Sequence, residues 1–296
     1  MSEASGAGML KGKVAVVTGA SRGIGKGIAL ALAEQGATVY VTGRTTLPGS
    51  HPLPGTVGET AAACTARGTG TGGSGLAVAV DHGDDDAVAA LFARVEREQG
   101  RLDILVNNAF SLPDDLTEPE PFWVKPLSNW EMVEVGVRSS FVAARHAARI
   151  MTAQRSGLIV AISGYTGVAY TYGVIFGMTK SAVDRMARDM ATELKRYDVA
   201  SVSLWQGLTF TERAERNLAA IAGLSSQPAT RPGNGCSPEY PGRVIAALAA
   251  DPDVMKRSGA TLITAELAGE YGITDVDGRV IPSLRQARGT PIWSPV

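Results

Sequence analysis

The length, composition and charge of the chain are those of an enzyme-sized globular protein. It has 296 residues, of which 45% are hydrophobic and 19% charged, and its formal net charge is -1. With basic and acidic residues almost balanced, no overall field favours nucleic acid or an anionic membrane. The two cysteines and three histidines are scattered and lack disulfide-framework or zinc-ligand spacing, so we assign no metal. The sequence has neither a leader peptide nor an apolar run of membrane-spanning length, and we expect a cytoplasmic protein.

Short apolar runs alternate with helical patterns along the chain, which indicates βαβ units and a parallel sheet. The runs are continuous, as in strands buried on both faces, and cover residues 14–17, 38–41, 76–80, 104–106, 158–162 and 199–204. Helices are expected at 24–35, 59–66, 84–98, 129–152 and 174–196, with Ser128 and Glu131 as a capping box before the fourth. We therefore predict an α/β fold, a doubly wound Rossmann-type sheet, as one domain over residues 1–296.

A glycine-rich turn follows the first predicted strand and leads directly into a helix. It places Gly19, Ser21, Gly23, Ile24 and Gly25 where the backbone can approach a pyrophosphate. The free N–H groups and the positive end of the helix would meet the phosphate charge. This context predicts a dinucleotide site rather than a chance glycine-rich turn.

Two arginines indicate which dinucleotide binds. The second strand ends at Arg44, where a protein that binds a 2′-hydroxyl usually has an acidic residue. Arg22 lies in the glycine loop, beside the same end of the adenosine. Two guanidinium groups could hold a 2′-phosphate, so the sequence predicts NADP(H) rather than NAD(H).

These motifs together resemble the short-chain dehydrogenase/reductases along essentially the whole chain. The resemblance lies in Thr18-Gly19-x-x-x-Gly23-Ile24-Gly25, Asp81, Asn107-Asn108-Ala109 and Ser163. Finer features, including Val135-Gly136-Val137-Arg138 and the segment 270–278, look like the dehydrogenase/reductase member 1 branch. The resemblance implies that Asp81, Asn108, Lys180, Gly207 and Thr211 also contact the cofactor. It further implies a homodimer or homotetramer.

The family resemblance also implies a catalytic trio of Ser, Tyr and Lys, of which one member is replaced. Ser163 would orient the substrate oxygen and Lys180 would bind ribose and lower the pKa of the tyrosine. Phe176 stands at the place of the tyrosine, 13 residues after Ser163 and four before Lys180. Phenylalanine keeps the ring but has no proton to give, so ordinary carbonyl reduction should be severely impaired.

Three interpretations of Phe176 stay open. The tyrosine was replaced deliberately to trap a complex. Alternatively, Phe176 is natural, and the enzyme transfers hydride to an iminium-type substrate or uses Tyr165, Tyr170 or Tyr172 as the proton donor. In the third, the chain is a catalytically silent NADP(H)-binding or scaffold protein. Tyr165 is the nearest to Ser163, although it could equally be an aromatic wall of the pocket.

The loops after the strands suggest a small apolar substrate. Aromatic residues gather there in the sequence, namely Phe110, Phe122, Trp123, Tyr165, Trp205 and Phe210. Residues 209–235 are rich in turn formers and predict a lid over the cofactor. The leading hypothesis is an NADP(H)-dependent oxidoreductase acting on a carbonyl, alcohol or imine. The motifs specify neither the substrate nor the direction of the reaction.

Overall fold

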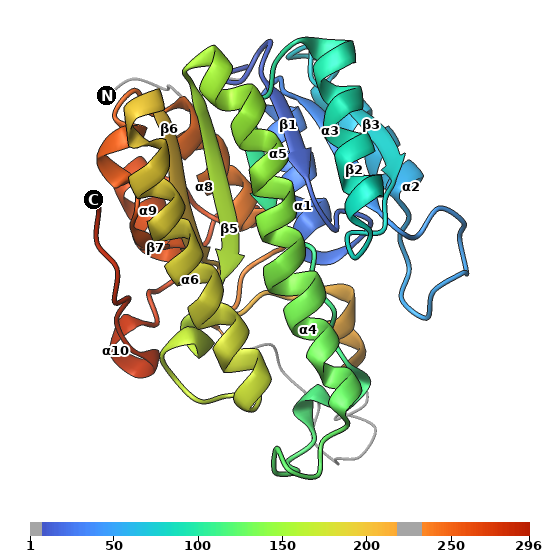
Figure 1. Cartoon of the computed structure of the whole chain (residues 1–296), viewed down its shortest axis with the longest axis vertical. Helices are drawn as coiled ribbons and strands as arrows, with labels where there is room; N and C mark the ends of the chain where they lie inside the picture. The colour runs from blue at the N-terminus through green and yellow to red at the C-terminus, as the bar shows by residue number, and fades with distance from the viewer. Residues whose placement is uncertain (1–7, 218–232) are drawn as a thin grey trace.

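The computed structural model describes residues 8–217 and 233–296 and is built around one parallel sheet (Figure 1). Its strand order is β3-β2-β1-β4-β5-β6-β7. The strands are β1 Val14–Val17, β2 Thr38–Gly43, β3 Ser74–Ala79, β4 Ile104–Asn107, β5 Gly157–Ser163, β6 Val199–Trp205 and β7 Thr261–Ile263. The chain runs outward from β1 to β3 and then returns to β4 on the other side of β1. This reversal confirms the doubly wound, Rossmann-type prediction.

Helices cover both faces of the sheet (Figure 1). One layer contains α1 Gly23–Glu34, α2 Val57–Gly68, α8 Tyr240–Ala250 and α9 Thr264–Tyr271, and the other contains α3 Asp85–Gln99, α5 Ser139–Gln154 and α6 Val174–Leu194. Each layer packs its own cluster of buried aliphatic side chains against the sheet. Parallel strands must be covered on both faces, which explains their unbroken hydrophobic sequences.

The helix predicted at 129–152 is interrupted. A 3₁₀ turn at Leu127–Trp130 leads into α4, Glu131–Val133, and a π-helical segment at Glu134–Arg138 precedes α5. The predicted capping box is wrong, because Ser128 lies inside the 3₁₀ turn and no side chain caps α4. A one-residue π insertion is invisible to a 3.6-residue periodicity, and such insertions often mark functional sites.

The carboxyl ends of the strands meet at one edge of the sheet, at the bottom of Figure 1. The loops after β1, β4, β5 and β6 all reach this edge, so it is where a ligand is expected in an open α/β sheet. Of the predicted lid at 209–235, residues 218–232 lie outside the described residues, and residues 212–217 form a helical turn. Within the described chain, no helix is long and apolar enough to cross a membrane.

Candidate cofactor and active site

The glycine loop between β1 and α1 is shaped by close backbone contacts. Gly19 has φ 64°, and a Cβ there would lie 2.8 Å from the Cα of Ala109. A Cβ at Gly25 would lie 2.4 Å from the side-chain nitrogen of Asn108. Any side chain at these two positions would force the loop away from β4, so the glycines are required for the turn.

Asn108 ties the glycine loop to the end of β4. Its side-chain amide donates hydrogen bonds to the carbonyl oxygens of Thr18 (2.9 Å) and Gly19 (3.1 Å). The Thr18 hydroxyl accepts hydrogen bonds from the backbone N–H groups of Asn108 and Ala109, both at 2.9 Å. In this structure Asn108 therefore shapes the loop around the predicted cofactor site.

The first amide of α1 binds an anionic oxygen. Gly23 N donates to Glu212 Oε2 at 2.8 Å, and a Cβ built on Gly23 would lie 3.5 Å from the Thr211 methyl group. The start of α1 therefore accepts a negatively charged oxygen, as binding of a pyrophosphate there would require. The structure also brings the predicted Thr211 onto the glycine loop, and Gly207, with φ 79°, makes the turn after β6.

Arg22 and Arg44 lie close enough to repel each other. Burial lowers the pKa of Arg22 and the charge of Arg44 lowers it further, whereas Glu212 raises it. Arg22 donates to the carbonyl oxygens of Pro54 (3.0 Å) and Gly55 (2.8 Å). Arg22 also donates to the hydroxyl of Thr45, the residue after Arg44, at 3.0 Å, so the two predicted arginines lie at one end of the site with the segment 45–56 folded against Arg22.

Two further ionisable residues, Asp81 and His51, belong to this end of the site. Arg44 Nη1 lies 4.0 Å from Asp81 Oδ2, and both side chains are exposed. The field of Arg22 contributes, after burial, to lowering the pKa of His51. No motif in the sequence marks His51, because its approach to Arg22 depends on how the segment 45–56 folds back.

Lys180 is buried at the predicted catalytic position between two aromatic rings. Its amine lies 4.2 Å from the ring centre of Phe110 and 5.7 Å from that of Phe176, and it donates to the Ile162 carbonyl at 3.3 Å. Burial lowers the pKa of Lys180 to about 8, against the raising effect of the Asp184 charge. The structure therefore brings Phe176 and Lys180 together, as their spacing predicts.

Phe110 was not predicted beside Lys180, and Gly136 explains its place. A Cβ at Gly136, in the π-helical segment, would lie only 2.5 Å from the Phe110 ring. The ring therefore occupies space that a larger residue at 136 would need. Phe110 also packs edge-to-face on Phe176 at 5.5 Å between ring centres. Next to Lys180, the described residues thus form an aromatic wall.

Ser163 faces away from this wall. Its side chain is fully buried, and its hydroxyl donates to the backbone carbonyl of Lys180 at 3.3 Å. The next residue, Gly164, is extended, and its built Cβ has no neighbour closer than Thr166 Oγ1 at 3.9 Å. Successive side chains of an extended chain point to opposite sides. A side chain at position 164 would therefore point to the open side, whereas the Ser163 side chain points to the buried side.

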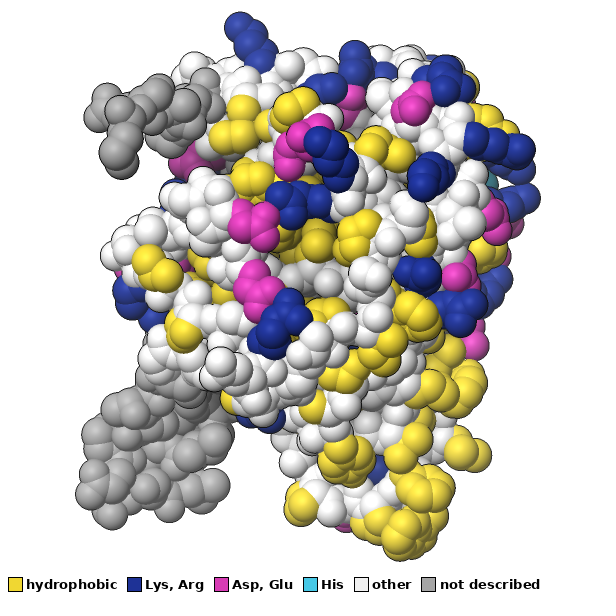
Figure 2. All heavy atoms as spheres, turned by 90° about the vertical axis from the view of Figure 1, so that its left-hand side faces the viewer, with side chains coloured by type: hydrophobic (Ala, Val, Ile, Leu, Met, Phe, Trp, Pro, Cys, Tyr) yellow, Lys and Arg dark blue, Asp and Glu magenta, His cyan; other side chains and the backbone are white. Residues whose placement is uncertain are grey.

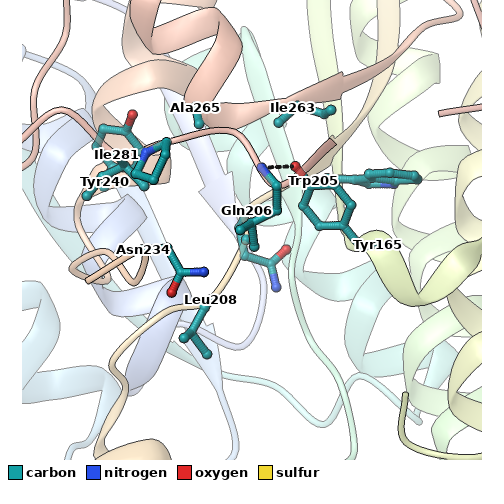
Figure 3. A pocket seen from close by; sticks show the side chains of 12 residues that line it. Tyr165, Trp205, Gln206, Leu208, Asn234, Tyr240, Ile263, Ala265 and Ile281 are labelled. Carbon is teal, nitrogen blue, oxygen red and sulfur yellow. Dashed lines mark hydrogen bonds between the residues drawn. The ribbon is translucent and has the colours of Figure 1, made fainter. Parts of the chain in front are cut away.

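Tyr165, the proposed substitute proton donor, is directed elsewhere. Its ring packs on Trp205 at 4.7 Å between centres, and its hydroxyl accepts a hydrogen bond from the Leu284 backbone N–H at 3.1 Å (Figure 3). Burial raises the pKa of this tyrosine. These contacts are those expected if Tyr165 forms part of the pocket wall, the alternative to a role as proton donor. Of the other two candidates, Tyr172 contacts Phe176 at 5.3 Å between ring centres.

Several of the predicted substrate aromatics lie on the surface instead. Phe122 and Trp123 are 63% and 74% exposed, and nearby Leu127 is 92% exposed. Hydrophobic side chains gather at the lower end of the molecule in Figure 2. Trp205, by contrast, is fully buried and donates its indole N–H to Asp184 Oδ2 at 3.0 Å.

The comparison with known families decides where this fold and site belong. The family model for short chain dehydrogenase matches residues 13–221, which include β1 to β6, the glycine loop and Lys180. The chain is a short-chain dehydrogenase/reductase. This confirms the resemblance found in the sequence and shows an oxidoreductase family that acts on small molecules with nicotinamide cofactors.

Relatives of this short-chain dehydrogenase/reductase include dehydrogenase/reductase SDR family member 1 of Mus musculus and Homo sapiens. They are 39% and 38% identical, and each alignment spans 92% of this chain and 86% of the relative. These matches confirm the predicted branch. A short-chain type dehydrogenase/reductase from Mycobacterium marinum has a TM-score of 0.69 at 27% identity, covering 86% of this chain and 94% of that one. A metagenomic short-chain oxidoreductase in complex with NADP has a TM-score of 0.64 at 26% identity, covering 86% and 96%.

Proposed function

We propose that this chain is an NADP(H)-dependent oxidoreductase for a small apolar substrate. The convergence of Arg22 and Arg44 beside the glycine loop supports the choice of cofactor. NADPH would supply a hydride, and the chain's own residues would bind and orient it. Gly19, Gly23 and Gly25 would admit the pyrophosphate, Arg22 and Arg44 the 2′-phosphate, and Lys180 the ribose next to the nicotinamide. The NADP complex of the metagenomic relative is consistent with this assignment.

The test of cofactor choice is calorimetric titration with NADPH and NADH. Charge-assisted hydrogen bonds contribute about 1.5–3 kcal/mol each, so NADPH should bind more than about tenfold more tightly. Arg44→Ala should remove most of the difference and leave NADH affinity nearly unchanged. Equal affinities for the two cofactors in the unaltered protein would refute the assignment.

The residues around Lys180 favour a substrate that needs no proton from the aromatic wall of Phe110 and Phe176. Phe110 and Phe176 present hydrocarbon to the amine, and Ser163 turns its hydroxyl into the protein. An already cationic acceptor, such as an iminium, needs a hydride but no proton. NADPH consumption should therefore be faster with cyclic imines, near the pH at which they are protonated, than with matched ketones.

A silent NADP(H)-binding protein is the second candidate, and the same observations favour it. Among the described hydrogen bonds, the Ser163 hydroxyl bonds to the backbone carbonyl of Lys180 and the Tyr165 hydroxyl to Leu284 N, and neither bonds to the Lys180 amine. The two candidates differ in turnover but not in cofactor binding. NADPH consumption over a panel of aldehydes, ketones, quinones and imines separates them, since tight NADPH binding without consumption on any class supports the silent protein.

A further inference from the structure

The carboxylate of Glu212 sits on the amino-terminal end of α1. Its Oε2 accepts the hydrogen bond from Gly23 N at 2.8 Å, and its charge is felt by Arg22. Gly23 is the first residue of a 12-residue helix. The contact joins the loop after β1 to the segment after β6, which are 189 positions apart in the chain. Glu212 was not singled out by the sequence, because no motif marks it.

Local backbone contacts hold Glu212 in this position. The segment before it is anchored by Phe210 N to the Cys236 carbonyl at 3.0 Å and by Cys236 N to the Leu208 carbonyl at 2.9 Å. The helical turn that starts at Glu212 is capped by Thr211, whose hydroxyl accepts from Ala214 N at 3.4 Å. The backbone leading to Glu212 is thus anchored, and a turn of its side chain is enough to break the contact with Gly23.

We propose that Glu212 is an internal competitor that occupies the place of the cofactor's pyrophosphate and must be displaced when NADP(H) binds. This inference rests on the proposed function. A phosphate at the start of α1 would draw on the free N–H groups there, and that of Gly23, with one hydrogen to donate, is already bonded to Glu212. Two anions cannot share this position, because like charges in a partly buried site repel strongly. Glu212 therefore lowers the affinity of the protein for the cofactor.

The effect on affinity follows from the population of the open state. A ligand that binds only when Glu212 has turned away has an apparent affinity reduced by the fraction of molecules in that state. A charge-assisted hydrogen bond of ordinary strength keeps that fraction at about one tenth or below. Removing the carboxylate should therefore tighten NADPH binding by about tenfold or more.

The experiment measures binding by calorimetry for the unaltered protein, Glu212→Gln, Glu212→Ala and the control Glu193→Gln. Glu193 is an exposed carboxylate near the end of α6, so its variant removes the same charge elsewhere. Two probes are titrated. NADPH carries the pyrophosphate, whereas 2′-AMP carries the adenosine and the 2′-phosphate alone. Circular dichroism verifies that each variant is folded.

We expect both Glu212 variants to bind NADPH about tenfold more tightly, with a smaller gain for 2′-AMP, whose phosphate is affected by Glu212 only through its charge acting at Arg22 and competes for no hydrogen bond of Gly23. Glu193→Gln should match the unaltered protein. Unchanged or weaker NADPH binding in both Glu212 variants overturns the inference, as does an equal gain for both probes. If the unaltered protein and every variant fail to bind NADPH, the proposed function itself fails.

Discussion

At the scale of single residues, Phe176 presents a ring beside Lys180 but no hydroxyl that could donate a proton. Phe176→Tyr should place a phenol one helical turn from Lys180, whose positive charge favours the phenolate. Proton donation is worth at least about 10²-fold in rate, so NADPH-dependent reduction of some aldehyde or ketone should rise by that factor. Steady-state rates over a carbonyl panel provide the check. A variant that binds NADPH normally but reduces no carbonyl indicates a pocket built for other chemistry.

The places of Ser163 and Gly164 predict which hydroxyl would assist such a tyrosine. In the Phe176→Tyr background, Gly164→Ser should raise kcat/KM further, because its extended backbone tolerates a side chain and the built Cβ meets open space. Ser163→Ala in the same background should change kcat/KM by less than about threefold, since a hydroxyl bonded to backbone contributes little to a transition state it does not touch. A loss of 10²-fold or more in the second variant would show that Ser163 orients the substrate after all.

The buried amine of Lys180 has a predictable effect on stability. Its pKa is lowered from 10.5 to about 8 by burial. Below pH 8 the folded protein must bury a cation, which costs about 3 kcal/mol. As pH rises from 8 to 10.5 the folded state loses its proton before the unfolded chain does, so stability recovers. Lys180→Met should therefore be more stable than the unaltered protein below pH 8, and the difference should vanish towards pH 10.5 in urea titrations.

The residue scale also shows what the sequence could and could not predict about the site. The glycine loop, Arg22, Arg44 and the Phe176–Lys180 pair depend on local spacing or on strand ends, and all lie where the sequence places them. Phe110 and Glu212 reach their partners through long-range folding, which no local motif encodes. The family resemblance assigns Ser163 from its place after a predicted strand, and that place does not determine on which side of the strand the side chain points.

At the scale of elements, α2 shows how one cap supports the arginine end of the site. Thr56 precedes α2, and its hydroxyl accepts the Glu59 N–H at 3.0 Å while the side chain is almost fully buried. Thr56→Ala should lower the free energy of unfolding by about 1 kcal/mol, because the helix loses its N-cap. Thr56→Ser keeps the acceptor and should recover most of that loss. Equal losses for both substitutions would mean that packing, not capping, accounts for the effect.

The predicted strands and the uninterrupted predicted helices agree with the structure to within a few residues, whereas the elements after β6 were not predicted. The first six strands and α1, α3 and α6 agree with their patterns to within about three positions, as expected for strongly periodic segments. Strand β7 has three residues, too few for any period, and was missed. Helices α8 and α9 lie beyond the last predicted strand, where small and charged residues weaken the apolar pattern.

At the scale of the whole molecule, the strand order brings the loops after β1 and β4–β6 to one edge of the sheet, although they are spread over some two hundred residues. The reversal of strand order between β1 and β4 opens a crevice there. Asn108 and Glu212 bond to the glycine loop from two distant parts of the chain. The topology therefore determines where the site forms, and local sequence motifs identify only some of its residues.

The hydrogen bond between Glu212 and Gly23 also affects thermal unfolding. Without ligand, the carboxylate makes a stabilising contact with α1 that the phosphate of the cofactor would make in the complex. An acidic group at the start of a helix stabilises it by about 0.3–1 kcal/mol or somewhat more when partly buried, so Glu212→Gln should melt a few degrees earlier without ligand. Saturating NADPH stabilises each protein according to its own affinity, and Glu212→Gln should therefore show the larger rise in Tm. In differential scanning calorimetry the Tm values of the two proteins should differ most without NADPH and least at saturating NADPH. A screen that ranks ligands by the rise in Tm would consequently rank NADPH lower with the unaltered protein than with Glu212→Gln.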